Sequence, residues 1–197
     1  MKLIDNPIAM LLLMGGKSSR MGQNKAWLTY KGVPFWEGLV EELKSCGPVY
    51  LSVDCKANKP CEDYPVLIDA YREIGPLGGI YTALSQIPEP YLFVCACDMP
   101  HVDRSFVQKL MSYVDERWEG VMVQDRQGRA YATAGIYSKK MLPLMKKMIE
   151  EKNYRLQYLL RQSHVCYVTL EEMGMAENVV MNVNTPEEYT KLKGDSL

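Results

Sequence analysis

Two glycines followed by several cations form the stretch of this sequence best suited to chemistry. Gly15 and Gly16 end an apolar run, and Lys17, Arg20 and Lys25 follow them. Because glycine lacks a Cβ atom, backbone N–H groups at such a turn can approach a ligand closely. Amides, a guanidinium and an ammonium group together suit the negative charges of a triphosphate. The stretch predicts an anion-binding loop, although glycines beside cations also occur in ordinary solvated loops.

This loop does not match either of the two standard phosphate-binding motifs. Five residues separate Gly16 from Gly22, and Gln23 follows where a P-loop has Lys and then Ser or Thr. The spacing G-x-G-x-x-G of dinucleotide-binding proteins does not occur here either. The sequence therefore predicts a different kind of nucleotide-binding loop.

Three aspartates follow predicted strands directly: Asp54, Asp69 and Asp98. The strands alternate with amphipathic helical patterns, which is typical of a parallel sheet covered on both faces. In such a sheet, ligands bind beyond the carboxyl ends of the strands. We therefore expect these carboxylates and the cationic loop to converge at one edge of the sheet.

The hydrophobic pattern predicts the elements that position these groups. Strands are expected at residues 10–14, 49–53, 65–68, 91–97, 121–123, 131–137 and 165–170. Helices are expected at residues 35–43, 76–87, 106–114, 142–149 and 155–161, and from Thr185, where T-P-E-E forms a capping box. The hairpin within 121–137 suggests a mixed edge. The prediction is a single-domain α/β fold with a mostly parallel, mixed sheet and helices on both faces.

A divalent cation follows from bringing phosphates and carboxylates together, because the two repel each other without one. Mg²⁺ favours one or two carboxylates together with phosphate oxygens and waters. Asp98 is the predicted metal ligand. An aspartate after a strand also commonly forms a turn or a helix N-cap, so its position alone leaves both interpretations open.

The composition excludes several classes of protein. The 197 residues are 47% hydrophobic and 24% charged, as in an ordinary globular domain, and carry a formal net charge of −1. That charge provides no field for binding nucleic acid or an anionic membrane. Apolar runs are too short to span a bilayer, and residues 1–7 do not resemble a signal peptide. We expect a cytoplasmic location, with no nucleic acid and no membrane as partner.

The cysteines and histidines do not form a recognisable metal site. The six cysteines contain no C-x-x-C pair, so zinc is not expected. Cys95 and Cys97 are expected to be small buried residues. His101 and His164 are isolated in the sequence and are expected in loops or at the surface.

Residues 11–32, LLLMGGKSSRMGQNKAWLTYKG, resemble the pattern L-x-G-G-x-S-x-R-M-G-x-x-K that opens the molybdenum cofactor guanylyltransferases, a family of nucleotidyltransferases. Three later segments are similar to motifs of the same family and come in the same order: 75–80 (GPLGGI), 97–100 (CDMP) and 182–187 (NVNTPE). The resemblance spans nearly the whole chain and implies a Rossmann-like nucleotidyltransferase fold over residues 1–197.

The resemblance implies a reaction and a set of site residues. GTP and molybdopterin would react to give molybdopterin guanine dinucleotide and pyrophosphate, with Mg²⁺ as cofactor and transient contacts to other molybdenum cofactor proteins. Catalysis is implied for Lys25, Arg20 and Asp98, with Asp98 also binding the metal. The implied nucleotide-binding residues, in a part covering about 8–115, are Met14, Gly15, Gly16, Lys25, Asp54, Asp69 and Asp98. The implied acceptor-binding residues are Gly78, Gly79, Arg155, Asn182 and Asn184, with the pterin part covering about 116–197.

The chain departs from the family pattern at several positions. Met14 replaces the usual Ala, and Asp54 stands where the family often has Asn. Residues 130–132 read Ala-Tyr-Ala, whereas the family tends to place a Pro in this stretch. Arg155 lies in the region that meets the pterin in the family, but a solvated helix face explains it equally well.

Two other functions are compatible with the sequence. A related nucleotidyltransferase could use CTP or a sugar-phosphate acceptor, although such relatives usually carry Ala-Ala-Gly where this chain has Gly15 and Gly16. A molybdopterin-binding or GTP-binding module without turnover is the other alternative. The presence of both Lys25 and Asp98 favours an enzyme.

Overall fold

The computed structural model describes residues 7–14, 25–55, 60–61, 63–71 and 73–194. Gly15, Gly16 and Arg20, which the sequence places in the anion-binding loop, lie outside the described residues.

The described strands form one seven-stranded sheet and a separate two-stranded hairpin. The sheet has the order β5-β4-β1-β6-β8-β7-β9. Its strands are β1 (Ile8–Leu13), β4 (Val49–Val53), β5 (Val66–Ile68), β6 (Tyr91–Ala96), β7 (Gly120–Gln124), β8 (Ala130–Ser138) and β9 (Val165–Thr169). Only β8 runs against its neighbours, β6 and β7. The predicted mostly parallel, mixed sheet is confirmed. The antiparallel strand β8 lies inside the sheet rather than at its edge, where β9 is parallel to its neighbour β7.

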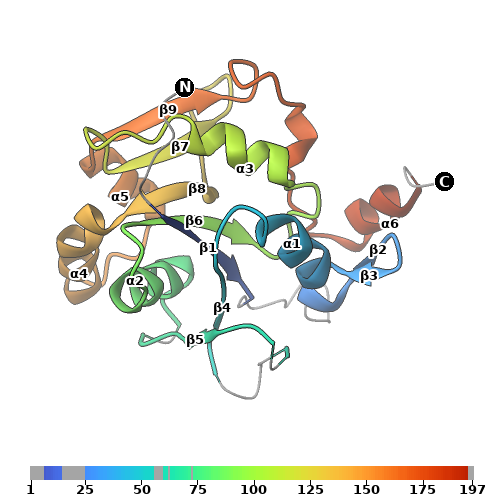
Figure 1. Ribbon diagram of the computed structural model, residues 1–197, viewed down its shortest axis with the longest axis horizontal. Helices are drawn as coiled ribbons and strands as arrows, with labels where there is room; N and C mark the ends of the chain where they lie inside the picture. The colour runs from blue at the N-terminus through green and yellow to red at the C-terminus, as the bar shows by residue number, and fades with distance from the viewer. Residues whose placement is uncertain (1–6, 15–24, 56–59, 62, 72, 195–197) are drawn as a thin grey trace.

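Helices cover both faces of this sheet (Figure 1). They are α1 (Phe35–Leu43), α2 (Pro76–Gln86), α3 (Arg104–Met111), α4 (Leu142–Glu150), α5 (Leu156–Gln162) and α6 (Pro186–Gly194). Met10 and Leu12 of β1 share a core with α1 and α3, while Leu11 and Leu13 share the opposite core with α2, α4 and α5. This alternation is what a strand buried on both faces requires.

The chain order places a topological switch beside β1. From β1 the chain passes through α1 to β4 and β5, and then returns through α2, on the other face, to β6 on the opposite side of β1. Ligands in open α/β sheets bind at such a switch, beyond the carboxyl ends of the strands. The expected position of a site is therefore the end of β1 and β6.

A small hairpin that the sequence did not reveal contacts the C-terminal helix. Strands β2 (Thr29–Tyr30) and β3 (Val33–Pro34) meet at Lys31 and Gly32, both with positive φ, as in the tight turns of hairpins. The Tyr189 hydroxyl of α6 donates to the Thr29 carbonyl over 2.9 Å and accepts from the Thr29 N–H over 3.1 Å. The C-terminal helix is thereby held against the hairpin that follows the loop.

The predicted capping box at the start of α6 is present. The Glu188 N–H donates to Thr185 Oγ1 over 3.2 Å, and the Thr185 N–H donates back to Glu188 Oε2 over 3.1 Å. Glu188 Oε2 also accepts from the Asn184 N–H over 2.6 Å. This fixes the backbone of Asn184, one of the predicted site residues.

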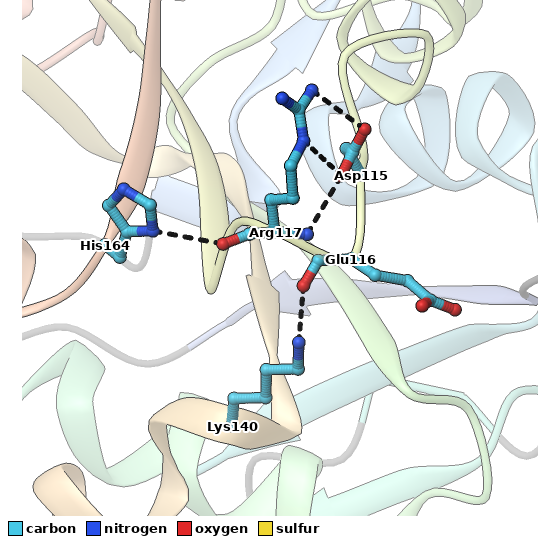
Figure 2. Close-up of polar contacts among 5 residues, drawn as sticks. All are labelled: Asp115, Glu116, Arg117, Lys140 and His164. Carbon is cyan, nitrogen blue, oxygen red and sulfur yellow. Dashed lines mark hydrogen bonds and ion pairs between the residues drawn. The ribbon is translucent and has the colours of Figure 1, made fainter.

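A set of polar contacts lies at the amino edge of the sheet, where β7 begins (Figure 2). Arg117 is bonded to both carboxylate oxygens of Asp115, and His164 Nδ1 lies 3.1 Å from the Arg117 carbonyl. Lys140 donates to the Glu116 carbonyl. The predicted exposure of His164 is confirmed, and its contact ties the connection after α3 to the residue before β9.

Within the described ranges, no helix is long and apolar enough to cross a bilayer.

Candidate active site

Three predicted site residues from distant parts of the chain meet at the end of β6. Lys25 Nζ donates to Asp98 Oδ2 over 2.9 Å and to Asn184 Oδ1 over 2.6 Å. Lys25 opens a short 3₁₀ helix, η1 (Lys25–Trp27), Asp98 follows β6, and Asn184 precedes α6. The Lys25 and Asp98 side chains are 17% and 15% exposed. The predicted convergence of a loop cation with a strand-end carboxylate is thus confirmed for this pair.

Backbone pairing fixes Asp98 at this edge. The Cys97 N–H donates to the Leu13 carbonyl over 3.2 Å, which extends the pairing of β6 and β1 to the residue before Asp98. The Val183 N–H donates to the Asp98 carbonyl over 2.8 Å. The next residue, Met99, is buried in the hydrophobic core. Asp98 therefore stands on a rigid backbone that connects the sheet to the segment carrying Asn182 and Asn184.

One oxygen of the Asp98 carboxylate is left without a hydrogen bond. Oδ1 is buried and has no hydrogen-bond partner among the residues that the structure describes. A buried carboxylate oxygen is costly unless a donor or a cation satisfies it. No group of three or more His, Cys, Asp or Glu in the described ranges could hold a metal by itself. One carboxylate with an unsatisfied oxygen fits Mg²⁺, which takes its remaining ligands from phosphates and waters.

The cysteines beside Asp98 are not nucleophiles. Burial, followed by the charge of Asp98, raises the pKa of the Cys97 thiol to about 12. Burial also raises the pKa of Cys95 well above its ordinary value. A thiol must ionise to attack, so neither is reactive at neutral pH. Both side chains are buried in the core, as predicted.

A second carboxylate, Asp69, lies at the end of β5. Its Oδ1 accepts from Ser52 Oγ over 2.7 Å, and its N–H donates to the Val53 carbonyl over 2.9 Å. The next N–H, of Ala70, donates to Thr82 Oγ1 over 3.0 Å. Burial raises the pKa of the Asp69 carboxyl, the Ser52 hydrogen bond lowers it, and the neighbouring charge of Asp54 raises it. Asp69 is thus a partly desolvated carboxylate with a fixed orientation.

Met14 and Asp54 occupy the strand ends between these two carboxylates. The Met14 N–H donates to the Ser52 carbonyl over 2.9 Å, so the pairing of β1 and β4 continues up to the residue before the glycines. The Met14 side chain is buried in the core, which leaves its backbone as the part available at the edge. Asp54 is exposed at the end of β4.

Gly78 and Gly79 have a packing role that the sequence did not reveal. Both are buried in the first turns of α2. A Cβ atom on Gly79 would lie 2.5 Å from Ser52 Oγ, and one on Gly78 would lie 2.9 Å from the Tyr71 carbonyl oxygen. The two glycines let α2 approach the ends of β4 and β5. Their assignment to the acceptor stays a prediction.

The other predicted acceptor residues differ in their surroundings. Asn182 is half-buried next to Val183, whose N–H binds the Asp98 carbonyl, so it lies beside the Lys25 cluster. Arg155 is exposed at the start of α5, a helix that is bonded to β8 through Gln157 Nε2 and the Ala130 carbonyl over 2.8 Å. Binding of the acceptor by Arg155 stays a prediction.

Comparison with known proteins identifies relatives over nearly the whole chain. The family described as MobA-like NTP transferase domain matches residues 10–170. A probable molybdenum cofactor guanylyltransferase from Geobacillus sp. is 32% identical, over 93% of this chain and 97% of its own. One from Clostridium perfringens is 33% identical, over 92% of this chain and 93% of its own.

Two solved structures show the same fold. Molybdopterin-guanine dinucleotide biosynthesis protein A from Archaeoglobus fulgidus has a TM-score of 0.81 at 16% identity, over 95% of this chain and 98% of its own. The 2-C-methyl-D-erythritol 4-phosphate cytidylyltransferase from Thermus thermophilus has a TM-score of 0.69 at 12% identity, over 94% and 97%. At these identities the likeness concerns the fold alone.

Proposed function

This chain belongs to the MobA-like NTP transferase family, and we propose that it transfers GMP from GTP to the terminal phosphate of molybdopterin. An oxygen of that phosphate attacks the α-phosphorus of GTP, the bond from the α-phosphorus to the bridging oxygen breaks, and pyrophosphate leaves. Molybdopterin guanine dinucleotide forms. The observation that carries the proposal is the meeting of Lys25, Asp98 and Asn184, which come from three separate motifs.

The reaction needs positioning and charge neutralisation rather than an enzyme nucleophile. The attacking phosphate is already ionised at neutral pH, so a general base is unnecessary. The raised pKa of Cys97 is consistent with direct transfer. Asp98 would hold a Mg²⁺ ion, which supplies charge neutralisation between the phosphates when bound.

Lys25 has two successive roles in this proposal. Before substrate binds, its ammonium group neutralises the Asp98 carboxylate, which avoids an unpaired charge in a mostly buried place. An ammonium group has three donors and rotates freely, so it can turn to the triphosphate while keeping Asn184 as a partner. There it stabilises the charge that develops on the leaving pyrophosphate. Arg20 and the Gly15 and Gly16 amides are proposed to bind the same triphosphate.

Asp69 is proposed to select the base. Guanine presents two adjacent N–H groups, on N1 and on the 2-amino group, and a carboxylate can accept both. The Asp69 carboxylate is half-buried at the same edge of the sheet, where its hydrogen bonds are shielded from water. Asp54, on the neighbouring strand end, is proposed to contact the nucleoside beside it.

The acceptor is proposed to bind beside Asp98, on the side away from Asp69 and the base. Asn182 and Asn184 flank Val183, which is bonded to the Asp98 backbone, so a phosphate bound by these amides would lie next to the metal ligand. Arg155 is proposed to complete the acceptor set. Gly78 and Gly79, which the resemblance assigns to the acceptor, pack beside Ser52 and Tyr71 at the end of the site where the base is proposed to bind. Transient contact with other molybdenum cofactor proteins would deliver and remove the pterin, and we propose a cytoplasmic location for these steps.

The test uses purified protein, Mg²⁺, molybdopterin and one nucleoside triphosphate at a time. We expect pyrophosphate release with GTP and a product with the mass of molybdopterin guanine dinucleotide. The preference should also appear as a rise in melting temperature with GTP and Mg²⁺ that exceeds the rise with CTP or ATP. Faster release with CTP would reassign the protein as a cytidylyltransferase, and GTP binding without release would make it a binding module.

A further inference from the structure

Two buried hydroxyl groups, one on β4 and one on α2, are hydrogen-bonded to the residues that end β5. Among the described residues, the serine and threonine side chains that are buried are Ser52, Thr82 and Ser138, at 2%, 1% and 2% exposure. Ser52 donates to the Asp69 carboxylate from β4, and Thr82 accepts from the Ala70 N–H from α2. Burying a hydroxyl is unfavourable unless it is hydrogen-bonded. Two of these three buried hydroxyls are therefore hydrogen-bonded at the same strand end.

The packing of α2 depends on the same contact. A Cβ atom on Gly79 would lie 2.5 Å from Ser52 Oγ and 3.4 Å from Asp69 Oδ1. A glycine here lets the helix lie directly over the Ser52 hydroxyl and brings Thr82, one turn later, to the Ala70 N–H. Together with the bond from the Asp69 N–H to the Val53 carbonyl, these contacts fix both the backbone and the side chain of Asp69.

A carboxylate that is held in one orientation accepts hydrogen bonds from fixed directions. Ionised Asp offers about four lone-pair positions on two oxygens, and Ser52 occupies one of them on Oδ1. The plane of the carboxylate is thereby set before a ligand arrives, so binding does not have to pay for ordering it. The Asp69 side chain is half-buried, so water solvates this carboxylate incompletely, and this burial raises its pKa. Ligand N–H donors are then stronger partners than they would be for an exposed Asp.

We propose that Ser52, supported by Thr82, is a positioning residue for base selection: it orients the Asp69 carboxylate to accept the N1–H and the 2-amino group of guanine. This inference rests on the proposed function and extends it to two residues that do not touch the substrate. It predicts that Ser52 affects which purine is bound and leaves the transfer step unchanged.

The first experiment compares GTP with inosine triphosphate, which lacks the 2-amino group. Binding of each to the full-length protein with Mg²⁺ is measured by calorimetry for wild type and Ser52→Ala. We expect the GTP affinity to fall about fivefold and the inosine triphosphate affinity to change less than twofold. The transfer rate at saturating GTP should be unchanged. An equal loss for both nucleotides, or no loss for either, overturns the proposal.

A double-mutant cycle tests whether Ser52 acts through Asp69. In the Asp69→Ala background, Ser52→Ala should cause no further change in the preference for GTP over inosine triphosphate. If the two losses add, Ser52 acts by another route and the proposal fails.

Thr82 provides a second route should Ser52→Ala not fold. Thr82→Val keeps the shape but removes the acceptor of the Ala70 N–H, so the preference for GTP should fall, whereas Thr82→Ser should retain it. Ser138→Ala is the matched control, because it removes an equally buried hydroxyl from β8 at the amino edge of the same sheet and should leave the preference intact. Loss of preference in this control overturns the proposal.

These outcomes are separate from those that decide the proposed function. A protein that binds GTP in preference to inosine triphosphate through Ser52, yet releases no pyrophosphate with molybdopterin, contradicts the transfer reaction and leaves the positioning role standing. If the protein makes the dinucleotide but Ser52→Ala weakens the binding of GTP and inosine triphosphate equally, only the positioning role is contradicted.

Discussion

The two edges of the central sheet carry the same kinds of charged residue but surround them differently. At the amino edge, Asp115 and Arg117 pair across two residues and are 42% and 74% exposed (Figure 2). At the carboxyl edge, Lys25 and Asp98 pair across 73 residues, are less than one-fifth exposed, and leave Asp98 Oδ1 without a hydrogen bond among the described residues. The first pair is local and largely exposed to water, whereas the second exists only because the fold brings two distant segments together.

This difference distinguishes an ordinary surface ion pair from the pair that is proposed to act in the transfer reaction. An exposed local ion pair contributes little to stability and could be lost at little cost. A buried carboxylate with an unsatisfied oxygen destabilises the fold, so its presence calls for a ligand. The comparison predicts that equivalent substitutions at the two edges will affect activity differently. We expect activity to be lost at the carboxyl edge and retained at the amino edge.

The largest effect is expected for Asp98→Asn. The substitution keeps the shape of the side chain but removes the charge proposed to hold the metal, so pyrophosphate release should fall about a thousandfold or more. The protein should remain folded by circular dichroism, because Lys25 keeps Asn184 as a partner. Asp115→Asn is the matched control and should release pyrophosphate at the normal rate. Near wild-type release by Asp98→Asn would make Asp98 a structural residue.

The next largest effect is expected for Lys25→Ala. In the proposed mechanism the ammonium group stabilises the leaving pyrophosphate more than the bound substrate. The single-turnover rate at saturating GTP should therefore fall about a hundredfold while GTP affinity falls less. Lys140→Ala, at the amino edge, removes a cation bonded to a backbone carbonyl and should change neither quantity. If Lys25→Ala weakens binding but reacts normally once saturated, the lysine is only an anchor.

At the carboxyl edge, the charged residues that follow strands could be predicted from the sequence. The positions of Asp69 and Asp98 after apolar runs placed both at the carboxyl edge, because parallel strands bring such ends together, but their roles were assigned through the resemblance to the family. The strands and helices themselves were predicted to within a few residues, because buried strands and amphipathic helices have distinct hydrophobic periods. Asn184 was also assigned, through its resemblance to a family motif.

The residues that hold these side chains in position could not be predicted from the sequence. Ser52 and Thr82 lie inside apolar segments, where a small hydroxyl residue has no distinctive pattern. Their partners are 17 and 12 residues away, so only the folded structure shows them. Gly79 belonged to a recognised motif, but its role in packing depends on the distance between α2 and Ser52. The hairpin turn at Lys31 and Gly32 was missed because its strands have two residues each and the turn lacks Asn-Gly or Asp-Gly.

A pH-dependent effect on stability is expected for Asp69. Burial raises its pKa in the folded protein above the ordinary value of 3.8, so its contribution favours folding below pH 3.8 and is lost as the pH rises through the folded pKa. At pH 7 the ionised carboxylate is therefore unfavourable, and Asp69→Asn should raise the free energy of unfolding there. Below pH 3.8 the gain should disappear. Urea unfolding at both pH values measures this, and an equal gain at both would mean that ionisation is not the cause.

The smallest effect is expected when a buried serine is replaced by alanine at each edge of the sheet. The comparison measures how much the hydrogen bond of a buried hydroxyl contributes to the free energy of unfolding. Ser52 and Ser138 are equally buried on the same sheet, but Ser52 Oγ is bonded to a carboxylate, whereas Ser138 Oγ has no hydrogen-bond partner among the described residues. Ser52→Ala removes a bond to a charged group and should lower the free energy of unfolding by about 1.5–3 kcal/mol at pH 7. Ser138→Ala removes an unsatisfied polar atom and should be neutral or slightly stabilising. Since both changes delete one oxygen from an equally buried site, the difference between them measures the hydrogen bond to Asp69. Equal losses in the two variants would mean that packing around serine, rather than the carboxylate contact, sets the stability of this strand end.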